Sequence, residues 1–432
     1  MMIKNIYRWL ACAVILLSAC GEGRQEELQV QALQGVEGSA LNPYLTRDEK
    51  GKAVLCWTEQ SASDSLYRLR YATYNERTGS FGVPVTVEPS AGTGTSAESM
   101  NKVGFKSDGT VLAMYTRKFT GEKNPWAGAI CYSLSLDHGK SWTASRYLHS
   151  DTSHRYGRSF FDLAVLRDGE LASVWLDGRY GKEDTGSALF FARTRKGAGF
   201  GKDSCISRST CECCRTDLLS SDDGSLHVAF RKILYPAAAL GKQVRDMVYM
   251  TSADNGKSFG KAILLHADNW KIEGCPHSGP TLAVTRDDVH ALWFTGAGKG
   301  GLNFVSMKKG QTSFAPPEAL TMTGRHPQMV ALEDGRLAMA WEEEQSGAGH
   351  AMQHTHAAMG HGAMMAAAAS GAASIHVSLH DKDGGRTEIR LPSGKEKGHH
   401  PVLVALKNGF LVAWQNEDAG RSGICYTYIG VK

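Results

Sequence analysis

The sequence predicts an all-β protein built as a ring of four-stranded antiparallel sheets, a β-propeller. Short apolar strands that end at an aromatic residue recur at spacings of 48 to 73 residues, and turns containing Gly precede most of them. Further apolar segments follow, so each repeat supplies two hairpins, which make one four-stranded sheet. The aromatic residues are Trp57, Tyr115, Trp175, Phe230, Trp293, Trp341 and Trp414.

The number of these strands favours seven sheets over six. The seventh repeat ends after residues 423–428 and lacks a fourth strand. Residues 27–33 alternate between polar and apolar side chains, as expected of a half-buried strand. We expect this N-terminal segment to complete the seventh sheet and close the ring, which removes exposed sheet edges.

The composition is that of a large globular protein. The chain has 432 residues, of which 42% are hydrophobic, and 48 glycines. This is enough for a large core, and propellers reach this size as one domain. The formal net charge is +4 without a basic run, so we expect no nucleic-acid partner. We also expect a monomer.

The N-terminus has the features of a targeting segment. Lys4 and Arg8 accompany a short apolar run at residues 9–17, which is too short to cross a bilayer and is typical of a signal peptide. Residues 17–21 resemble a bacterial lipobox, in which Cys20 becomes the acylated first residue. The alternative is ordinary signal cleavage next to an incidental cysteine.

We therefore predict a signal peptide at residues 1–19, a lipidated linker with the closing strand at 20–34, and a propeller at 35–432. The lipid would anchor the protein to a membrane of the cell envelope, facing the periplasm or the exterior. Gly21 rather than Asp follows the cysteine, which favours the outer membrane in a Gram-negative cell.

Residues 135–142 and 252–259 share the pattern Ser-x-Asp-x-Gly-x-Ser-Trp/Phe. Asp can bond its own backbone and Gly tolerates positive φ, so the pattern predicts a hairpin turn anchored by a buried aromatic ring. It resembles the Asp-box, or BNR repeat, of the sialidase (neuraminidase) superfamily, with eroded copies at 75–81, 196–200 and 308–314. The resemblance implies a propeller more strongly than an activity, because many non-enzymes carry the motif.

An exo-acting glycoside hydrolase is one function that the resemblance implies. Sialidases share an arginine triad that holds the substrate carboxylate, an aspartic acid, and a Tyr/Glu nucleophile pair. Arg158, Arg215 and Arg325 lie near the starts of three inner strands, and Asp162 could serve as the acid. The family's Arg-Ile-Pro motif is replaced by Leu-Asn-Pro at 41–43, and no nucleophile can be assigned. Arginines at such places are more often structural.

Cysteines and histidines precede several predicted inner strands, which converge at one mouth of a propeller channel. Cys211, Cys213 and Cys214 precede the fourth sheet and Cys275 the fifth. Disulfides are one interpretation, since the compartment is oxidising, but the sequence cannot choose their pairing. A thiolate and imidazole site for Cu(I) or zinc is the other. Its histidines would be His277, His326, His399 and His400.

An insertion at residues 347–373 interrupts the sixth repeat and is rich in Met and His. Thioether and imidazole donors without carboxylates favour copper, and a flexible loop can wrap an ion. An unselected low-complexity insertion is the alternative. The donors are His350, Met352, His354, His356, Met359, His361, Met364 and Met365.

The sequence therefore favours a soft-metal function, with copper preferred over zinc. The Cys/His cluster would be the ordered site, and the insertion would capture the ion or deliver it to a metal-handling partner in the envelope. The alternatives are the glycoside hydrolase and a scaffold that binds a protein or glycan through the mouth.

Overall fold

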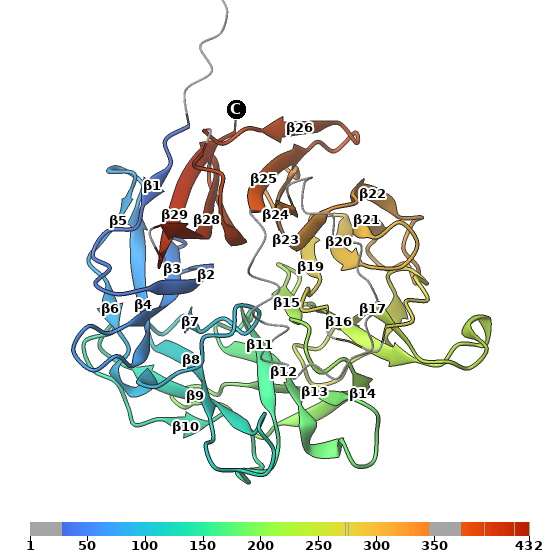
Figure 1. Cartoon of the computed structure of the whole chain (residues 1–432), viewed down its shortest axis with the longest axis horizontal. Helices are drawn as coiled ribbons and strands as arrows, with labels where there is room; N and C mark the ends of the chain where they lie inside the picture. The colour runs from blue at the N-terminus through green and yellow to red at the C-terminus, as the bar shows by residue number, and fades with distance from the viewer. Residues whose placement is uncertain are drawn as a thin grey trace, which may run out of the picture.

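The computed structural model describes residues 28–272, 274, 276–344, 373–392, 394–418 and 420–431. Within them the chain is all-β, with 3₁₀ turns at Glu88–Ser90, Gly178–Tyr180 and Ala237–Ala239. No helix in this part of the chain is long and apolar enough to cross a bilayer. The sheets surround a central axis (Figure 1), which confirms the prediction of an all-β propeller with four-stranded sheets. The predicted signal peptide and Cys20 lie outside the described residues.

The first four blades each start with their innermost strand, and the chain then runs outward. Blade one holds β2 (Ala40–Arg47), β3 (Ala53–Gln60) and β4 (Tyr67–Asn75), with β5 (Ser80–Phe81) and β6 (Val85–Thr86) at its edge. Blade two holds β7 (Lys102–Phe105), β8 (Val111–Lys118), β9 (Gly128–Ser135) and β10 (Arg146–Tyr147). Blade three holds β11 (Arg158–Val165), β12 (Leu171–Asp177), β13 (Ser187–Arg193) and β14 (Ser204–Thr210). Blade four holds β15 (Asp217–Ser220), β16 (Leu226–Leu234), β17 (Val244–Ser252) and β18 (Ile263–Leu264).

The remaining strands continue the same order. Blade five holds β19 (Thr281–Val284), β20 (Asp288–Thr295), β21 (Gly301–Lys308) and β22 (Glu318–Thr321). Blade six holds β23 (Gly324–Ala331), β24 (Leu337–Glu344), β25 (Ala373–His380) and β26 (Arg386–Ile389). Blade seven holds β27 (His399–Leu406), β28 (Gly409–Asp418), β29 (Arg421–Gly430) and β1 (Gln31–Ala32).

The two ends of the described chain meet in blade seven. Gln31 of β1 pairs with Tyr426 of β29, and Ala32 pairs with Cys425. The sequence predicted a strand over residues 27–33, whereas the structure forms one only at Gln31–Ala32. The innermost strands contact one another around the axis in the order β2, β7, β11, β15, β19, β23, β27 and again β2.

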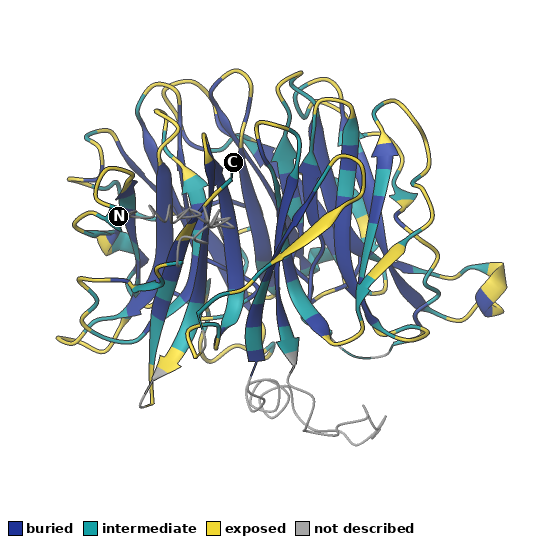
Figure 2. Cartoon of the chain, turned by 90° about the horizontal axis from the view of Figure 1, so that it is seen from above, coloured by how far each residue is buried: buried dark blue, intermediate teal, exposed yellow. Residues whose placement is uncertain are grey.

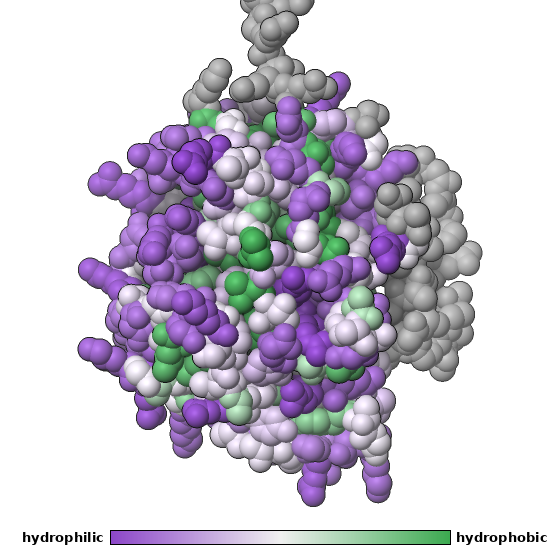
Figure 3. All heavy atoms as spheres, turned by 90° about the vertical axis from the view of Figure 1, so that its left-hand side faces the viewer, coloured by the Kyte–Doolittle hydropathy of each residue, from purple (hydrophilic) through white to green (hydrophobic). Residues whose placement is uncertain are grey.

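Apolar clusters fill the spaces between consecutive blades. One cluster joins blades seven and one through residues such as Trp57 and Val404, and another joins blades six and seven around Trp414. The buried strands therefore form a continuous middle layer, while the connecting turns at both ends are exposed (Figure 2). On the side that carries blade one, apolar residues lie in small groups among hydrophilic ones (Figure 3).

Three of the recurring tryptophans also carry a polar contact. The indole N–H of Trp57 donates to Glu59 at 2.7 Å, that of Trp175 to Asp177 at 3.3 Å, and that of Trp341 to Glu343 at 2.6 Å. The acid stands two residues after the tryptophan, so both side chains lie on the same face of the strand. This Trp-x-Asp/Glu pattern satisfies a buried donor in three blades.

The two Asp-box-like turns have matching geometry. In the first, Asp137 accepts from the backbone and hydroxyl of Ser141 at 2.9 and 2.6 Å. In the second, Asp254 accepts from Ser258 at the same distances. Each turn follows the third strand of its blade, β9 or β17, and joins it to the outermost strand. Their position at the periphery makes them structural elements.

Four innermost strands begin with the same irregularity. One residue near the start of the strand has a left-handed backbone, with φ between 49° and 55°, and the strand register shifts there. A non-glycine residue in this conformation is strained by roughly 1–3 kcal/mol, so surrounding contacts must hold it in place. The residues are Asn42, Phe160, His326 and His400.

A side chain of the preceding blade accepts the backbone N–H of each of these residues. We call these four contacts the axial hydrogen bonds. Each one ties two neighbouring blades together close to the central channel. The acceptors are Gln415 Oε1 for Asn42 (3.2 Å), Ser99 Oγ for Phe160 (3.0 Å), Ser278 Oγ for His326 (3.3 Å) and Glu342 Oε1 for His400.

Substitution of Ser99 tests the contribution of an axial hydrogen bond to stability. Ser99→Ala leaves the buried N–H of Phe160 without its acceptor, which should lower the free energy of unfolding by about 1–3 kcal/mol. Urea denaturation measures this value. Ser107→Ala, at an exposed turn of the same blade, should change it by less than about 0.5 kcal/mol. Equal effects of the two substitutions would contradict the role assigned to Ser99.

Candidate functional site

Histidine and carboxylate side chains gather at one mouth of the channel. Glu98 stands before β7, His326 lies in β23 and His400 lies in β27, so three blades contribute. Their donor atoms, one carboxylate oxygen and two imidazole nitrogens, lie within 4.8 Å of one another. We call these three residues the mouth cluster. The sequence predicted both histidines as ligands but did not single out Glu98.

Glu342 holds the histidines of the mouth cluster from behind. Its carboxylate lies 2.9 Å from His326 Nδ1 and 3.5 Å from the Nδ1 atoms of His399 and His400. Burial opposes the ionisation of Glu342, but the neighbouring imidazoles outweigh it and hold the pKa of this carboxyl well below its ordinary value. Glu342 is therefore a buried anion whose charge is matched by histidine.

The two histidines of the mouth cluster differ in protonation. His326 places Nδ1 against Glu342 and Nε2 3.1 Å from the carbonyl oxygen of His277. Two acceptors favour an imidazolium with both nitrogens protonated. Burial lowers the pKa of His326, but the charge of Glu342 outweighs it and the pKa is raised. For His400 burial dominates and lowers the pKa to about 4, so this ring is neutral at pH 7.

Arg215 connects the mouth cluster to three blades. Its guanidinium lies 3.4 Å from Glu98 and donates to the carbonyl oxygens of Pro327 at 2.9 Å and Pro280 at 3.4 Å. Glu98 also accepts the backbone N–H of Gly279 at 3.2 Å. Burial opposes the ionisation of Glu98, but Arg215 and the histidines outweigh it and lower its pKa. Arg215 is thus a buried structural cation.

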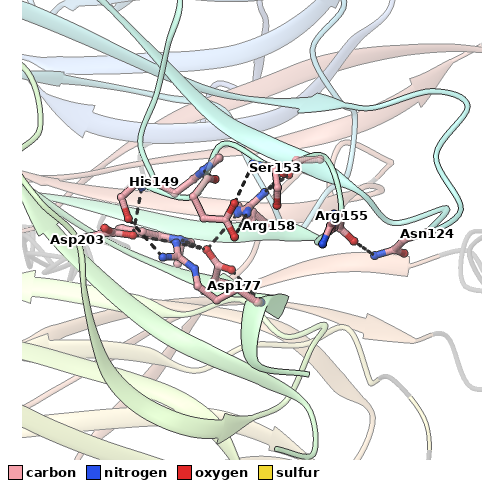
Figure 4. A network of polar contacts seen from close by, with 12 residues as sticks. Asn124, His149, Ser153, Arg155, Arg158, Asp177 and Asp203 are labelled. Atoms are coloured by element: carbon pink, nitrogen blue, oxygen red, sulfur yellow. Dashed lines mark hydrogen bonds and ion pairs between the residues drawn. The ribbon is translucent and has the colours of Figure 1, made fainter. Parts of the chain in front are cut away.

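The other two arginines proposed for a triad have different partners. Arg158 lies between Asp177 at 3.2 Å and Asp151 at 3.3 Å, and its side chain is fully buried. Figure 4 shows it within a network that extends to Asp203. The Arg325 guanidinium lies 5.2 Å from the centre of the Phe294 ring. The carboxylates that Arg158 contacts, Asp151 and Asp177, differ from Glu98, which Arg215 contacts.

Asp162, the candidate acid, lies in a layer of buried charges below the mouth. It accepts the backbone N–H of Leu218 at 2.8 Å and lies 3.3 Å from Lys102 Nζ. Asp217, in turn, accepts the backbone N–H of Leu282. Burial and the negative charge of Asp162 raise the pKa of Asp217 to about 7. These carboxyl groups therefore tie blades three, four and five together.

The three cysteines before β15 are in contact with one another. Cys211 Sγ lies 3.6 Å from Cys213 Sγ and 3.8 Å from Cys214 Sγ. Cys213 is disulfide-bonded, whereas Cys211 and Cys214 are free thiols. The predicted set of four thiolates is therefore reduced here to two thiols beside a disulfide. The fourth predicted ligand, Cys275, lies outside the described residues.

The strand ends that flank the Met/His-rich insertion lie at the same end of the propeller as the mouth cluster. Gly324 at the start of β23 pairs with Glu343, and the next residue, Glu344, pairs with Ala373 of β25. The last residues of β24 therefore stand beside the start of β23, which carries His326. The predicted donors of the insertion, His350 to Met365, lie outside the described residues.

Comparison with known proteins supports the fold. No family model matches the chain, and no curated protein matches it. The crystal structure of polysaccharide lyase Uly1 is similar with a TM-score of 0.56 and 13% identity, covering 96% of this chain and 94% of that one. The NanB sialidase of Streptococcus pneumoniae has a TM-score of 0.48 and 10% identity over 74% of this chain and 68% of that one. An α-L-arabinanase of Penicillium chrysogenum has a TM-score of 0.47 and 12% identity over 94% and 97%.

Several residues of the site had only weak sequence signals. Glu98 stands four residues before the inner strand β7, but a single Glu in such a turn is not distinctive. Glu342 follows Trp341 in the Trp-x-Asp/Glu pattern and precedes the acid that bonds the indole. Lys102 and Asp217 fall within ordinary strand sequence. Their roles depend on contacts between blades, which no local pattern records.

The raised pKa of Asp217 predicts a pH-dependent stability. Between the ordinary value of 3.8 and about 7 the folded protein holds a proton that the unfolded chain releases, so stability falls as the pH rises. The slope is about 1.4 kcal/mol per pH unit for one proton. Asp217→Asn keeps an acceptor for Leu282 and cannot ionise. Denaturation at about pH 5 and about pH 8 should show a smaller loss of stability in the variant; an unchanged loss would contradict the assignment.

Proposed function

We propose that the mouth cluster binds a copper ion through Glu98, His326 and His400. The observation that carries this proposal is the convergence of a carboxylate and two imidazoles, within 4.8 Å, from three separate blades. His326 and His400 stand near the starts of inner strands, where the axial hydrogen bonds fix the backbone. Glu98 lies in the turn before β7 and is held by Arg215 and by the backbone N–H of Gly279. Ligands on rigid elements favour a defined coordination geometry.

The donor set suits a borderline divalent ion. Imidazole nitrogen binds copper and zinc well. Along the series of divalent first-row metals, the affinity of a given site increases up to copper and is lower for zinc. His400 is neutral and has a lone pair to offer. His326 must release a proton, and Glu342 then remains beside its ring as an orienting acceptor. Copper(II) is therefore the preferred ion and zinc(II) the second.

The burial of the three ligands also favours an ion over a sugar. The side chain of Glu98 is 5% exposed, and those of His326 and His400 are 16% and 20% exposed. A metal ion can reach the mouth cluster without the cleft that a polysaccharide requires.

The insertion has the composition expected of a capture segment for this site. Its imidazole and thioether donors suit copper in either oxidation state. The strands that flank it end at the mouth, so an ion held by the insertion would have a short path to the cluster. With the lipobox-like segment, these features support an envelope lipoprotein that takes up copper and passes it to a metal-handling partner.

The similarity to a polysaccharide lyase keeps carbohydrate chemistry as the alternative. The observation that favours it is a fold match over nearly the whole length of both chains. Against it, the arginines that would hold an acidic sugar are engaged with protein groups. Turnover of an acidic polysaccharide by the metal-free protein would favour this alternative over copper binding.

Substitution of the ligands tests the proposed copper site. Glu98→Gln, His326→Ala and His400→Ala should each weaken Cu(II) binding by about tenfold or more, because each removes one of three protein donors. Isothermal titration calorimetry, with metal content by mass spectrometry, measures affinity and stoichiometry. His290→Gln is the control, since His290 bonds Ser306 within blade five.

A loop replacement separates the mouth cluster from the insertion. Glu344 and Ala373 are directly paired, so Asn-Gly in place of residues 345–372 can close the β24–β25 hairpin. This variant should keep one Cu(II) at the mouth cluster and lose the additional ions. Loss of all copper with the loop, or full binding after the three ligand substitutions, would contradict the proposal.

A further inference from the structure

The cysteines before β15 form a compact group of three sulfurs. Cys211, Cys213 and Cys214 are each no more than 5% exposed, and Cys211 Sγ lies within 3.8 Å of both others. Cys213 is bonded to another sulfur, while its two neighbours are thiols. A nucleophile at 3.6 Å from a disulfide sulfur is close to an attacking position. We call these residues the sulfur cluster.

Two buried arginines face the thiols. Arg245 Nη1 lies 3.2 Å from Cys211 Sγ, and Arg231 Nε lies 3.3 Å from Cys214 Sγ. Arg245 also pairs with Glu212 at 2.9 Å, which offsets part of its charge. Guanidinium groups beside a sulfur stabilise its thiolate. The sulfur cluster therefore sits in a positive environment, although it is enclosed by the protein.

The thiols have opposite protonation tendencies. A hydrogen bond from Cys214, together with the two arginines, outweighs burial and lowers the pKa of Cys211 to about 6. Burial and the adjacent Cys211 raise the pKa of Cys214 well above its ordinary value. This combination supplies a thiolate nucleophile with a protonated thiol next to it, which thiol–disulfide exchange requires.

We propose that the sulfur cluster is an internal thiol–disulfide exchange centre in which Cys211 opens the disulfide of Cys213. Cys211 Sγ attacks Cys213 Sγ, and a bond between them forms as the bond from Cys213 to its partner breaks. The partner sulfur leaves as a thiolate with the electron pair. The proton of Cys214 passes to that thiolate, and Cys214 Sγ then attacks Cys211 Sγ, which releases the Cys213 thiolate.

The exchange consumes no oxidant or reductant. One disulfide and two thiol groups exist before and after, but the disulfide moves from Cys213 to the pair Cys211–Cys214. The connection between Cys213 and its partner is thereby made reversible within the folded protein. This inference is independent of the proposed copper site, because Glu98, His326 and His400 contribute no atom to the exchange.

Trypsin allows a direct test, because cleavage after Arg208 and Arg215 releases residues 209–215 with all three cysteines. Before exchange this peptide is joined to a second peptide; after exchange it carries its own internal disulfide. The native protein is incubated with iodoacetamide, which traps released thiols, then quenched in acid and mapped by mass spectrometry. The wild type should accumulate the unjoined peptide with one internal disulfide and one alkylated cysteine.

Matched variants make the result decisive. Cys211→Ser should lower the rate of release at least about tenfold, because the nucleophile is lost. Cys205→Ser is the control: this free cysteine lies on β14 and should leave the rate unchanged. If Cys211→Ser fails to fold, Arg245→Gln, which keeps every sulfur, should slow the release, and Arg245→Lys should restore part of it. A wild-type peptide that stays joined, or is released equally fast in Cys211→Ser, would overturn the proposal.

Discussion

The axial hydrogen bonds are the contacts on which the site depends. At four inner strands, a strained left-handed residue is held because its N–H is accepted by the preceding blade. Two of these residues, His326 and His400, also belong to the mouth cluster. Glu342 joins both roles, since it accepts the N–H of His400 and faces three imidazoles. The geometry of the ring and that of the site are therefore set by the same atoms.

Several pairs of opposite charges are buried in the channel. Arg215 faces Glu98, His326 faces Glu342, and below them Lys102 faces Asp162. Loss of one partner from such a pair is costly, because the remaining charge stays buried without compensation. In this setting the imidazolium of His326 supplies a positive charge that a bound metal ion would replace. Binding of the proposed copper ion would therefore be coupled to release of this proton.

Local patterns predicted most of the fold but only part of the site. The alternating strands, the Asp-box-like turns and the repeated tryptophans are each encoded within a few residues, so they could be recognised in the sequence. The histidines at the starts of two inner strands, His326 and His400, likewise marked residues that reach the mouth. The length of the N-terminal strand was overestimated, because the alternation of side chains covers residues 27–33 whereas regular strand pairing with β29 is limited to Gln31 and Ala32.

The remaining features depend on contacts between blades. Arg158, which the sialidase resemblance made a candidate for an arginine triad, is held by Asp151 and Asp177, two acids that the sequence did not connect with it. Glu98 and Glu342 acquire their roles only when the ring brings blades two, six and seven together. The compartment expected for the chain permits disulfides, but the sequence could not show which of the three cysteines is bonded. In the structure Cys213 forms a disulfide, and Cys211 and Cys214 remain thiols.

Crystals of the copper-loaded protein, measured on both sides of the copper absorption edge, would locate the ion directly. The account predicts an anomalous peak between Glu98, His326 and His400, with Glu342 still behind the imidazole rings. A peak at the sulfur cluster instead, or a mouth cluster without copper at saturating concentration, would contradict it.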